Sequence, residues 1–551
     1  MAEVSNPKPR DWVLGEHLGY VIGETSHTQV TFTCRRPVRV GEYVLVEYDF
    51  NSEPSYALGI VERSAIGNPM ISVMSVRPEF VTTVSEFGAE RHEYMIGQAR
   101  ILSWLHTLLS RRGELVTPRY PPRPAAKVYS ASDEVLRKIF VKPAKDGWVK
   151  LGTLVNHPNV PFYVNVPRMV SRHLAILAIT GAGKSNTVAV LLSRIVGELR
   201  GTALVIDMHS EYGDVVEGKT NVIKPMMHPA KLTLSEYYAL LNLDEGATKQ
   251  RMYLRRAYRE LFETGEALKM KDRFLELLLG KLIEYHDTAG KNVGTTKKKS
   301  SKKGEVIGRR LETIPKKDQT PILDLIHKLE ELIDNYGGTV LTPSAPDRLE
   351  SVVKPGHVNV LDLGSVDEVV ADVVTYHYLW WLLNERKRHV VNGEGYPIPV
   401  LAVIEEAHVL VPNNRKTLTK GVVARIAREG RKFGVGLALV SQRPKNVDED
   451  ALSQTNNKII LKLVEPKDQQ YVQRASETLS DELLQLLPSL NTGEAVVLGM
   501  MAPLPALVRI DRAERKGTGS DIPVHREWAD FWERRKSGDD EPADFYEELG
   551  F

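Results

Sequence analysis

The chain has 551 residues, of which 42% are hydrophobic and 26% charged, values that are ordinary for soluble globular protein of roughly three to four domains. The net charge of +2 excludes a polycation, so any nucleic-acid binding has to come from local patches. Cys34 is the only cysteine, which excludes an intrachain disulfide and suits a reducing compartment. No signal-peptide pattern or apolar run approaching ~20 residues is present, so we expect a cytoplasmic protein without a membrane segment.

The first 140 residues have the pattern of a small β-barrel. Short β-branched and aromatic runs lie at 19–22, 29–33, 43–48 and 56–62, separated by prolines and glycines. The histidines of this region lack the spacing of metal ligands, and we interpret them as ordinary core or surface residues: His17, His27, His92 and His106. A proline-rich connector at 118–124 and a short helix near Ser132 lead to a second domain that starts near residue 141.

A phosphate-binding loop is predicted where the apolar run 174–179 leads into Thr-Gly-Ala-Gly-Lys-Ser-Asn. Glycines let backbone N–H groups turn toward phosphates, and the N-terminus of the next helix adds a positive dipole end. In such loops the lysine, here Lys184, reaches the β- and γ-phosphates of ATP, and the serine, here Ser185, holds Mg²⁺. We expect the following residues to surround the nucleotide: Thr180, Gly181, Ala182, Gly183, Lys184, Ser185 and Asn186.

The flanking segments agree with this interpretation, although Ala178 stands where the usual pattern has its first glycine. Apolar residues recur at helical spacing from Val188 to Leu199 and predict a helix with one buried face, which Gly201 would end. A buried strand at 203–207 follows and ends in Asp207. Strand ends of a doubly wound sheet face the ligand, so Asp207 is a candidate second carboxylate near Mg²⁺. Capping of a turn is its alternative role.

A helical insertion is expected from about 231 to 345, with the clearest helices at 234–241, 250–263 and 271–285. It contains a lysine-rich stretch at 291–304, with Arg309 and Arg310 just beyond. That stretch is either a solvated loop or a basic arm that contacts a phosphate backbone.

Paired carboxylates follow a buried strand that is predicted at 399–404. In a P-loop enzyme the first carboxylate orders the Mg²⁺ shell and the second polarises the water that attacks the γ-phosphate. These roles fall to Glu405 and Glu406. Aspartate is more usual in the first position, so the longer side chain of Glu405 changes the expected metal geometry.

Further candidates lie between 415 and 444. Gln442, after the strand 435–440, could sense the γ-phosphate from between the P-loop strand and the carboxylate strand. Arg431, with Arg428 second, could act as an arginine finger on an adjacent subunit's nucleotide, and a surface ion pair is the alternative. Strands at 458–463, 494–498 and 506–510 complete an α/β core over 141–510.

A C-terminal tail spans 511–551. Its last part, 521–551, has ten acidic against four basic residues. Trp528, Phe531 and Trp532 lie at i, i+3 and i+4, which predicts an apolar stripe that docks on the core, a neighbouring subunit or a partner.

These segments together resemble the HerA family, the archaeal branch of the HerA–FtsK ATPase superfamily. The resemblance covers residues 10–515 and rests on the order of five segments: 179–187, 204–212, 400–408, 428–434 and 441–444. It implies a RecA-like P-loop ATPase core with an inserted helical bundle and a preceding β-barrel. It also implies a homo-hexameric ring that pumps double-stranded DNA and works with the NurA nuclease and other double-strand-break repair proteins in end resection.

The resemblance also assigns residues. Lys184 and Ser185 would be the P-loop ligands, Glu406 the catalytic carboxylate and Arg431 the finger that acts in trans. Arg172 resembles a second arginine that contacts the nucleotide. The chain leaving the last strand, at Ile510 and Asp511, would cross to a nucleotide site as a brace, and basic residues at 413–420 are candidates for the pore lining.

Two other functions are weighed against a DNA translocase. A conjugation or secretion ATPase of the same superfamily would carry or dock onto membrane segments, and none is visible in the sequence. A nucleotide-gated scaffold for nuclease assembly would not need a water-polarising carboxylate such as Glu406.

Overall fold

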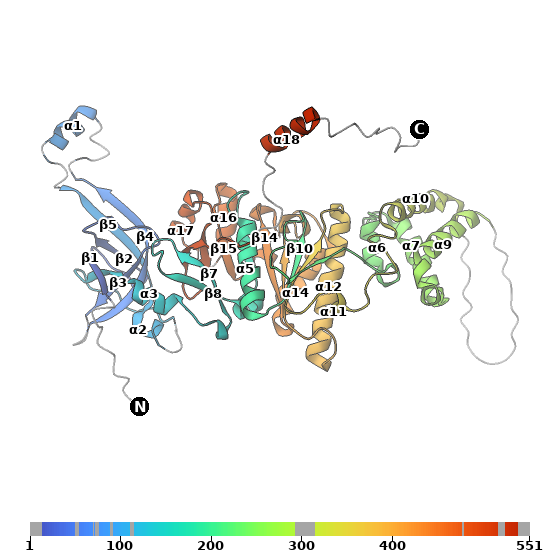
Figure 1. Cartoon of the computed structure of the whole chain (residues 1–551), viewed down its shortest axis with the longest axis horizontal. Coiled ribbons are helices and arrows are strands. Elements are labelled where there is room, and N and C mark those ends of the chain that lie inside the picture. The colour runs from blue at the N-terminus through green and yellow to red at the C-terminus, as the bar shows by residue number, and fades with distance from the viewer. Residues whose placement is uncertain are drawn as a thin grey trace.

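The computed structural model describes most of the chain: residues 14–49, 54–69, 71, 77–86, 88, 92–110, 115–291, 314–476, 479–515 and 524–537. The molecule is elongated, with a β-barrel at one end, a large sheet flanked by helices in the middle and a helical bundle at the other end (Figure 1). The basic stretch at 292–304 with Arg309 and Arg310, and the acidic end of the tail at 538–551, lie outside the described residues.

Six strands close the N-terminal barrel in the order β1-β2-β5-β4-β3-β6, which confirms the predicted barrel. Their bounds are β1 Leu14–Ile22, β2 Gln29–Thr33, β3 Tyr43–Tyr48, β4 Ser55–Gly67, β5 Tyr94–Trp104 and β6 Lys127–Ala131. Alternating side chains fill the interior, and the fully buried ring of Phe32 lies over Gly97. A Cβ at Gly97 would come within 2.5 Å of that ring, so the close approach requires glycine.

The central sheet has eleven strands in the order β11-β12-β10-β13-β14-β9-β15-β16-β17-β7-β8. Their bounds are β7 Trp148–Leu154, β8 Pro161–Asn165, β9 Leu174–Leu177, β10 Ala203–Asp207, β11 Thr220–Ile223, β12 Val358–Asp362, β13 Val400–Ile404, β14 Val435–Ser441, β15 Asn457–Ile460, β16 Glu494–Leu498 and β17 Ala506–Ile510. Strands from β11 to β15 run parallel, and those from β15 to β8 pair antiparallel. The central parallel strands β9, β10, β13 and β14 are largely apolar runs buried on both faces, as this arrangement requires.

Helices cover the sheet and form the insertion. Those of the core and its surroundings are α3 Asp133–Phe140, α4 Val166–Arg172, α5 Lys184–Leu199, α12 Glu368–Asn392, α13 Ala407–Leu410, α14 Leu418–Phe433, α15 Glu449–Ser453, α16 Pro466–Arg474 and α17 Asp481–Leu486. The insertion contains α6 Leu234–Leu240, α7 Thr248–Glu263, α8 Glu266–Lys269, α9 Phe274–Thr288 and α10 Gln319–Tyr336, and α11 Leu349–Val352 returns the chain to the sheet. The bundle lies at the far side of the sheet from the barrel (Figure 1).

One hydrophobic cluster joins the barrel to the sheet. It includes Tyr43 of β3, Phe140 of α3, Phe162 of β8 and Val188 of α5. The hydroxyl of Tyr43 also donates to the carbonyl of Pro505, 2.6 Å away, at the start of β17. Apolar packing therefore runs from the outer face of the barrel wall, which is turned toward the sheet, to the helix that follows the phosphate loop.

The C-terminal helix α18, Val524–Ser537, stands clear of the core (Figure 1). Trp528, Phe531 and Trp532 on it are 67%, 52% and 57% exposed. The predicted docking of this stripe on the chain's own core is therefore wrong, which leaves a neighbouring subunit or another partner. Among the helices of the described ranges, none is long and apolar enough to cross a membrane.

Candidate active site

The phosphate loop lies at the carboxyl end of β9. All four residues of β9 are buried, and α5 begins at Lys184. Gly181 and Gly183 have φ of 78° and 104°, which side chains rarely adopt, so this turn depends on glycine. The N–H of Gly493 donates to the carbonyl of Ala182 at 3.0 Å and supports the loop from behind. The loop is therefore held in shape by the sheet before any ligand binds.

Lys184 lies between the two predicted carboxylates. Its Nζ is 3.1 Å from Oε2 of Glu405 and 2.7 Å from Oε1 of Glu406. β13 brings them there because it ends at Ile404, two strands from β9 in the sheet. Glu406 adopts φ 46° and ψ 46°, a left-handed conformation. Such strain costs about 1–3 kcal/mol outside glycine and clusters at active sites.

The two carboxylates have different electrostatic surroundings. Burial raises the pKa of Glu405, which Lys184 and the Tyr212 hydroxyl only partly offset. Burial also opposes ionisation of Glu406, but His408, whose Nδ1 is 3.1 Å from Glu406 Oε2, and Lys184 outweigh it and lower the pKa of Glu406 to about 2. Glu406 is therefore an ionised carboxylate at neutral pH, as a residue that polarises water must be.

The carboxylate beside Ser185 is Glu211. Ser185 Oγ donates to Glu211 Oε2 at 2.7 Å. Asp207 instead has the turn-forming role, because its Oδ1 and Oδ2 accept from the N–H groups of His209 at 3.1 Å and Tyr212 at 2.9 Å. Asp207 thus has the turn-capping role that the sequence left as its alternative, and Glu211 is a second candidate for the carboxylate near the metal. The sequence motif contained Glu211, but only the left-handed turn at Ser210, with φ 57°, brings it back to the loop.

A magnesium ion fits this donor set. The hydroxyl of Ser185 and the carboxylate of Glu211 are the hard oxygen ligands that Mg²⁺ prefers. The two carboxylate oxygens of Glu405 contact Lys184 and Tyr212, and its role in ordering the Mg²⁺ shell stays a prediction. No group of three or more His, Cys, Asp or Glu side chains placed to hold a metal occurs among the described residues.

Gln442 lies where the sequence places it. β14 runs between β13 and β9, and Gln442 follows its last residue. The Thr180 hydroxyl donates to Gln442 Oε1 at 2.5 Å, so this side chain contacts the phosphate loop directly. A group at this point can respond to whatever occupies the loop.

The side chain of Asn186 holds the chain that leaves β17. Its Nδ2 donates to the carbonyl of Asp511 at 2.8 Å, and its Oδ1 accepts from the N–H of Ala513 at 3.0 Å. The carboxylate of Asp511 is 2.9 Å from Lys150 Nζ. Residues 511–513 thus contact the chain's own phosphate-loop helix, and the brace role of Ile510 and Asp511 stays a prediction.

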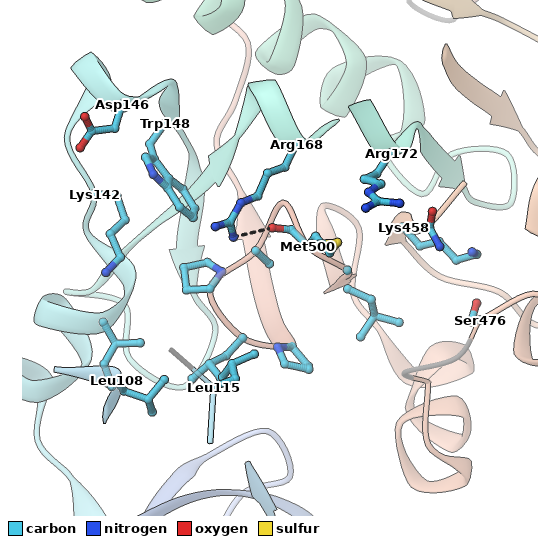
Figure 2. Close-up of a pocket in the computed structure, with 18 of the residues that line it drawn as sticks. Leu108, Leu115, Lys142, Asp146, Trp148, Arg168, Arg172, Lys458, Ser476 and Met500 are labelled. Atoms are coloured by element: carbon cyan, nitrogen blue, oxygen red, sulfur yellow. Dashed lines mark hydrogen bonds between the residues drawn. The ribbon is translucent and has the colours of Figure 1, made fainter. Parts of the chain in front are cut away.

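The candidate arginines lie at the opposite edge of the sheet. Arg172 ends α4 just before the amino end of β9, and Arg428 and Arg431 lie near the end of α14, just before β14. Since β9 and β14 are parallel, this edge faces away from the chain's own phosphate loop. Arg172 lines a cavity of about 610 Å³ with Arg168 and Lys458 among others (Figure 2). All three arginines therefore lie at the edge of the sheet opposite to that loop.

Family models match the whole core. A model described as the central domain of helicase HerA matches residues 149–380, and one described as the helicase HerA-like C-terminal region matches residues 346–510. The chain belongs to the HerA helicase family. The resemblance stated from the sequence motifs is thereby confirmed.

Relatives extend the HerA match over the barrel. The DNA double-strand break repair helicase HerA of Saccharolobus solfataricus is 38% identical over 97% of this chain and 99% of that protein. A probable helicase of Methanocaldococcus jannaschii is 36% identical over 96% of this chain and 98% of that protein. Among solved structures, VirB4 of Thermoanaerobacter pseudethanolicus aligns with a TM-score of 0.46 and 15% identity over 66% of this chain and 97% of that chain.

Proposed function

We propose that this chain is an ATP-driven translocase or helicase of double-stranded DNA. The observation that carries the proposal is Lys184 at the phosphate loop in contact with Glu406, an ionised and strained carboxylate. A site that only binds a nucleotide does not need such a carboxylate. The names of the HerA relatives as helicases for DNA double-strand break repair support DNA as the substrate.

The residues around the phosphate loop would each have a separate role in ATP hydrolysis. Lys184 would exchange its glutamate partners for phosphate oxygens, which frees Glu406 to orient and polarise a water molecule. Ser185 and Glu211 would hold Mg²⁺, which supplies positive charge to the phosphates. Gln442, in contact with Thr180, would report the presence of the terminal phosphate to β14.

A ring of copies explains the placement of the arginines. Arg172 and Arg431 lie at the edge away from their own loop, so each would complete the site of a neighbouring copy. Arg428 and Arg431 are exposed, and within the described part of the chain neither side chain has an ion pair or hydrogen bond. We propose a homo-hexamer that pumps DNA through its centre and partners a NurA-like nuclease in end resection.

The test is the ATPase rate with and without linear duplex DNA, at low and moderate salt. We expect Glu406→Gln to lower turnover by about 10²–10⁴-fold, as loss of a general base does. Glu330→Gln, at an exposed position of α10, is the matched control. DNA stimulation should fade as salt rises, because phosphate contacts release counterions.

Two results bear on the alternatives. Full turnover in Glu406→Gln would overturn the assignment of this site as the centre of hydrolysis. Turnover that DNA does not change would favour a ring gated by its nuclease partner, and the assay would then be repeated with the nuclease added.

A further inference from the structure

His173 is buried and strained at a junction of four elements. It follows the last residue of α4 with φ 60° and ψ 164°, a region that glycine adopts far more readily than other residues, and it is only 2% exposed. Its own carbonyl accepts from Nδ2 of Asn457, at the start of β15, at 2.8 Å. Such a conformation persists only where other contacts offset its cost, and the ring of His173 makes contacts of this kind.

The ring joins α14 to β14. Nδ1 of His173 lies 3.1 Å from the N–H nitrogen of Leu437 in β14, and Nε2 lies 3.1 Å from the carbonyl oxygen of Ala427 in α14. Because a backbone N–H can only donate, Nδ1 accepts and carries no proton. Nε2 then carries the proton and donates to Ala427. Burial lowers the pKa of His173, which agrees with this neutral form.

The bonded carbonyl belongs to the turn of α14 that carries the arginines. In an α-helix the carbonyl of residue 427 also accepts the N–H of residue 431, so His173 and the backbone of Arg431 meet at one oxygen. Arg428 follows Ala427 directly, and Arg172 precedes His173 directly. One imidazole therefore fixes the backbone beside both groups of candidate arginines.

The surrounding packing leaves this junction little freedom. A Cβ at Gly436 would come within 2.7 Å of the Cα of Val170, so β14 and α4 lie in backbone contact. Arg172 projects from this junction into the cavity at the edge of the sheet (Figure 2). Arg172 and Arg431 thus lie at the same edge of the sheet, on two helices that His173 joins.

We propose that His173 is a positioning residue that sets Arg172 and Arg431 relative to each other for joint contact with the nucleotide of a neighbouring copy. The proposal rests on the proposed function, because it needs a nucleotide between copies. His173 itself contacts no nucleotide in this arrangement. Its effect is on the rate at a neighbour's site and leaves nucleotide affinity at its own phosphate loop unchanged.

Two conservative variants separate the two ring bonds. In His173→Asn the amide oxygen can still accept from Leu437, and asparagine tolerates positive φ, but the bond to Ala427 is lost. In His173→Gln the longer amide can donate to Ala427. We expect His173→Asn to lower kcat about 10- to 100-fold, as a misplaced transition-state group does. His173→Gln should keep kcat within about threefold of the unmodified protein. The exposed His327→Asn on α10 is the matched control.

The decisive measurement is a double-mutant cycle with Arg431→Ala. If His173 acts through Arg431, adding His173→Asn to Arg431→Ala should cause almost no further loss of kcat, since coupled residues are not additive. The affinity for a fluorescent ATP analogue and the mass of the assembly in solution should equal those of the unmodified protein. Equal effects of His173→Asn and His173→Gln, or a full further loss in the Arg431→Ala background, would show that His173 only stabilises the fold and would overturn the proposal.

The same variants distinguish a failure of the positioning role of His173 from a failure of the proposed function. If Glu406→Gln abolishes turnover and Arg431→Ala lowers it while His173→Asn has no effect, only the positioning role fails. If Arg172→Ala and Arg431→Ala both leave turnover unchanged, the contact between copies fails and the inference fails with it.

Discussion

Replacing Lys184 with alanine should destabilise this protein even without nucleotide. The ammonium of Lys184 is the shared partner of Glu405 and Glu406, whose side chains are 4% and 6% exposed. Removing it leaves buried Glu405 without its cation and leaves Glu406 with the imidazole of His408 alone. Breaking a buried ion pair from one side costs about 3–5 kcal/mol. At roughly 2.1 cal/mol/K of unfolding entropy per residue, that corresponds to a Tm lower by about 4–6 °C for a unit of the size of residues 141–510.

The loss should depend on pH with a definite sign. Burial already holds the pKa of Glu405 above its ordinary value, and loss of Lys184 raises it further. A carboxyl whose pKa is raised on folding binds a proton in the folded state at a pH where the unfolded state has released it, so stability falls as pH rises through this range. The Tm deficit of Lys184→Ala should therefore be largest at pH 8 and shrink as the pH is lowered toward the raised pKa of Glu405.

Thermal unfolding at several pH values, read by circular dichroism, tests this reasoning. Adding Glu405→Gln to Lys184→Ala removes one buried charge and should restore most of the Tm without restoring ATPase activity. A Tm for Lys184→Ala within about 1 °C of the unmodified protein at pH 8 would refute the argument. So would a double variant no more stable than Lys184→Ala.

Three further predictions follow from single contacts. His408→Asn removes the imidazole that lowers the pKa of Glu406 to about 2, so the acid limb of the ATPase pH–rate profile should move to higher pH; an unchanged limb would contradict this role. Asn186→Ala loses two hydrogen bonds of about 1 kcal/mol each to residues 511–513 and should speed tryptic cleavage there, whereas the exposed Asn414→Ala should not. Gly436→Ala brings a Cβ against the backbone of Val170 and should cost about 1–3 kcal/mol in thermal unfolding, whereas Gly421→Ala, with open space around it, should cost none.

Local sequence patterns were sufficient to predict the strands and loops on which the site residues lie. β9 and β13 form from the predicted apolar runs. Lys184, at the end of the loop after β9, and Glu406, just beyond β13, lie in contact. The reason is geometric, because parallel strands bring their carboxyl ends to one edge of the sheet. The barrel was also predicted. The long strand β5 was not, because polar residues interrupt the apolar ones along it.

Contacts that depend on turns or distant segments could not be predicted. Glu211 rather than Asp207 meets Ser185 because of the left-handed turn at Ser210, which no residue pattern specifies. The bonds of His173 to Ala427 and Leu437 join positions that are 254 and 264 residues apart in the chain. Asn186 fits the phosphate-loop motif, yet its side chain serves residues 511–513, which only the path after β17 brings near.

The continuous hydrophobic cluster between Tyr43 of the barrel and Val188 of α5 has a practical consequence for dissecting this protein. A cut near residue 140 would divide one shared interior and leave apolar surface from both halves open to water. Each half would then tend to self-associate through the newly exposed face. Separate expression of a barrel and a motor is therefore a poor route to their individual properties, and substitutions in the intact chain are the better experiment.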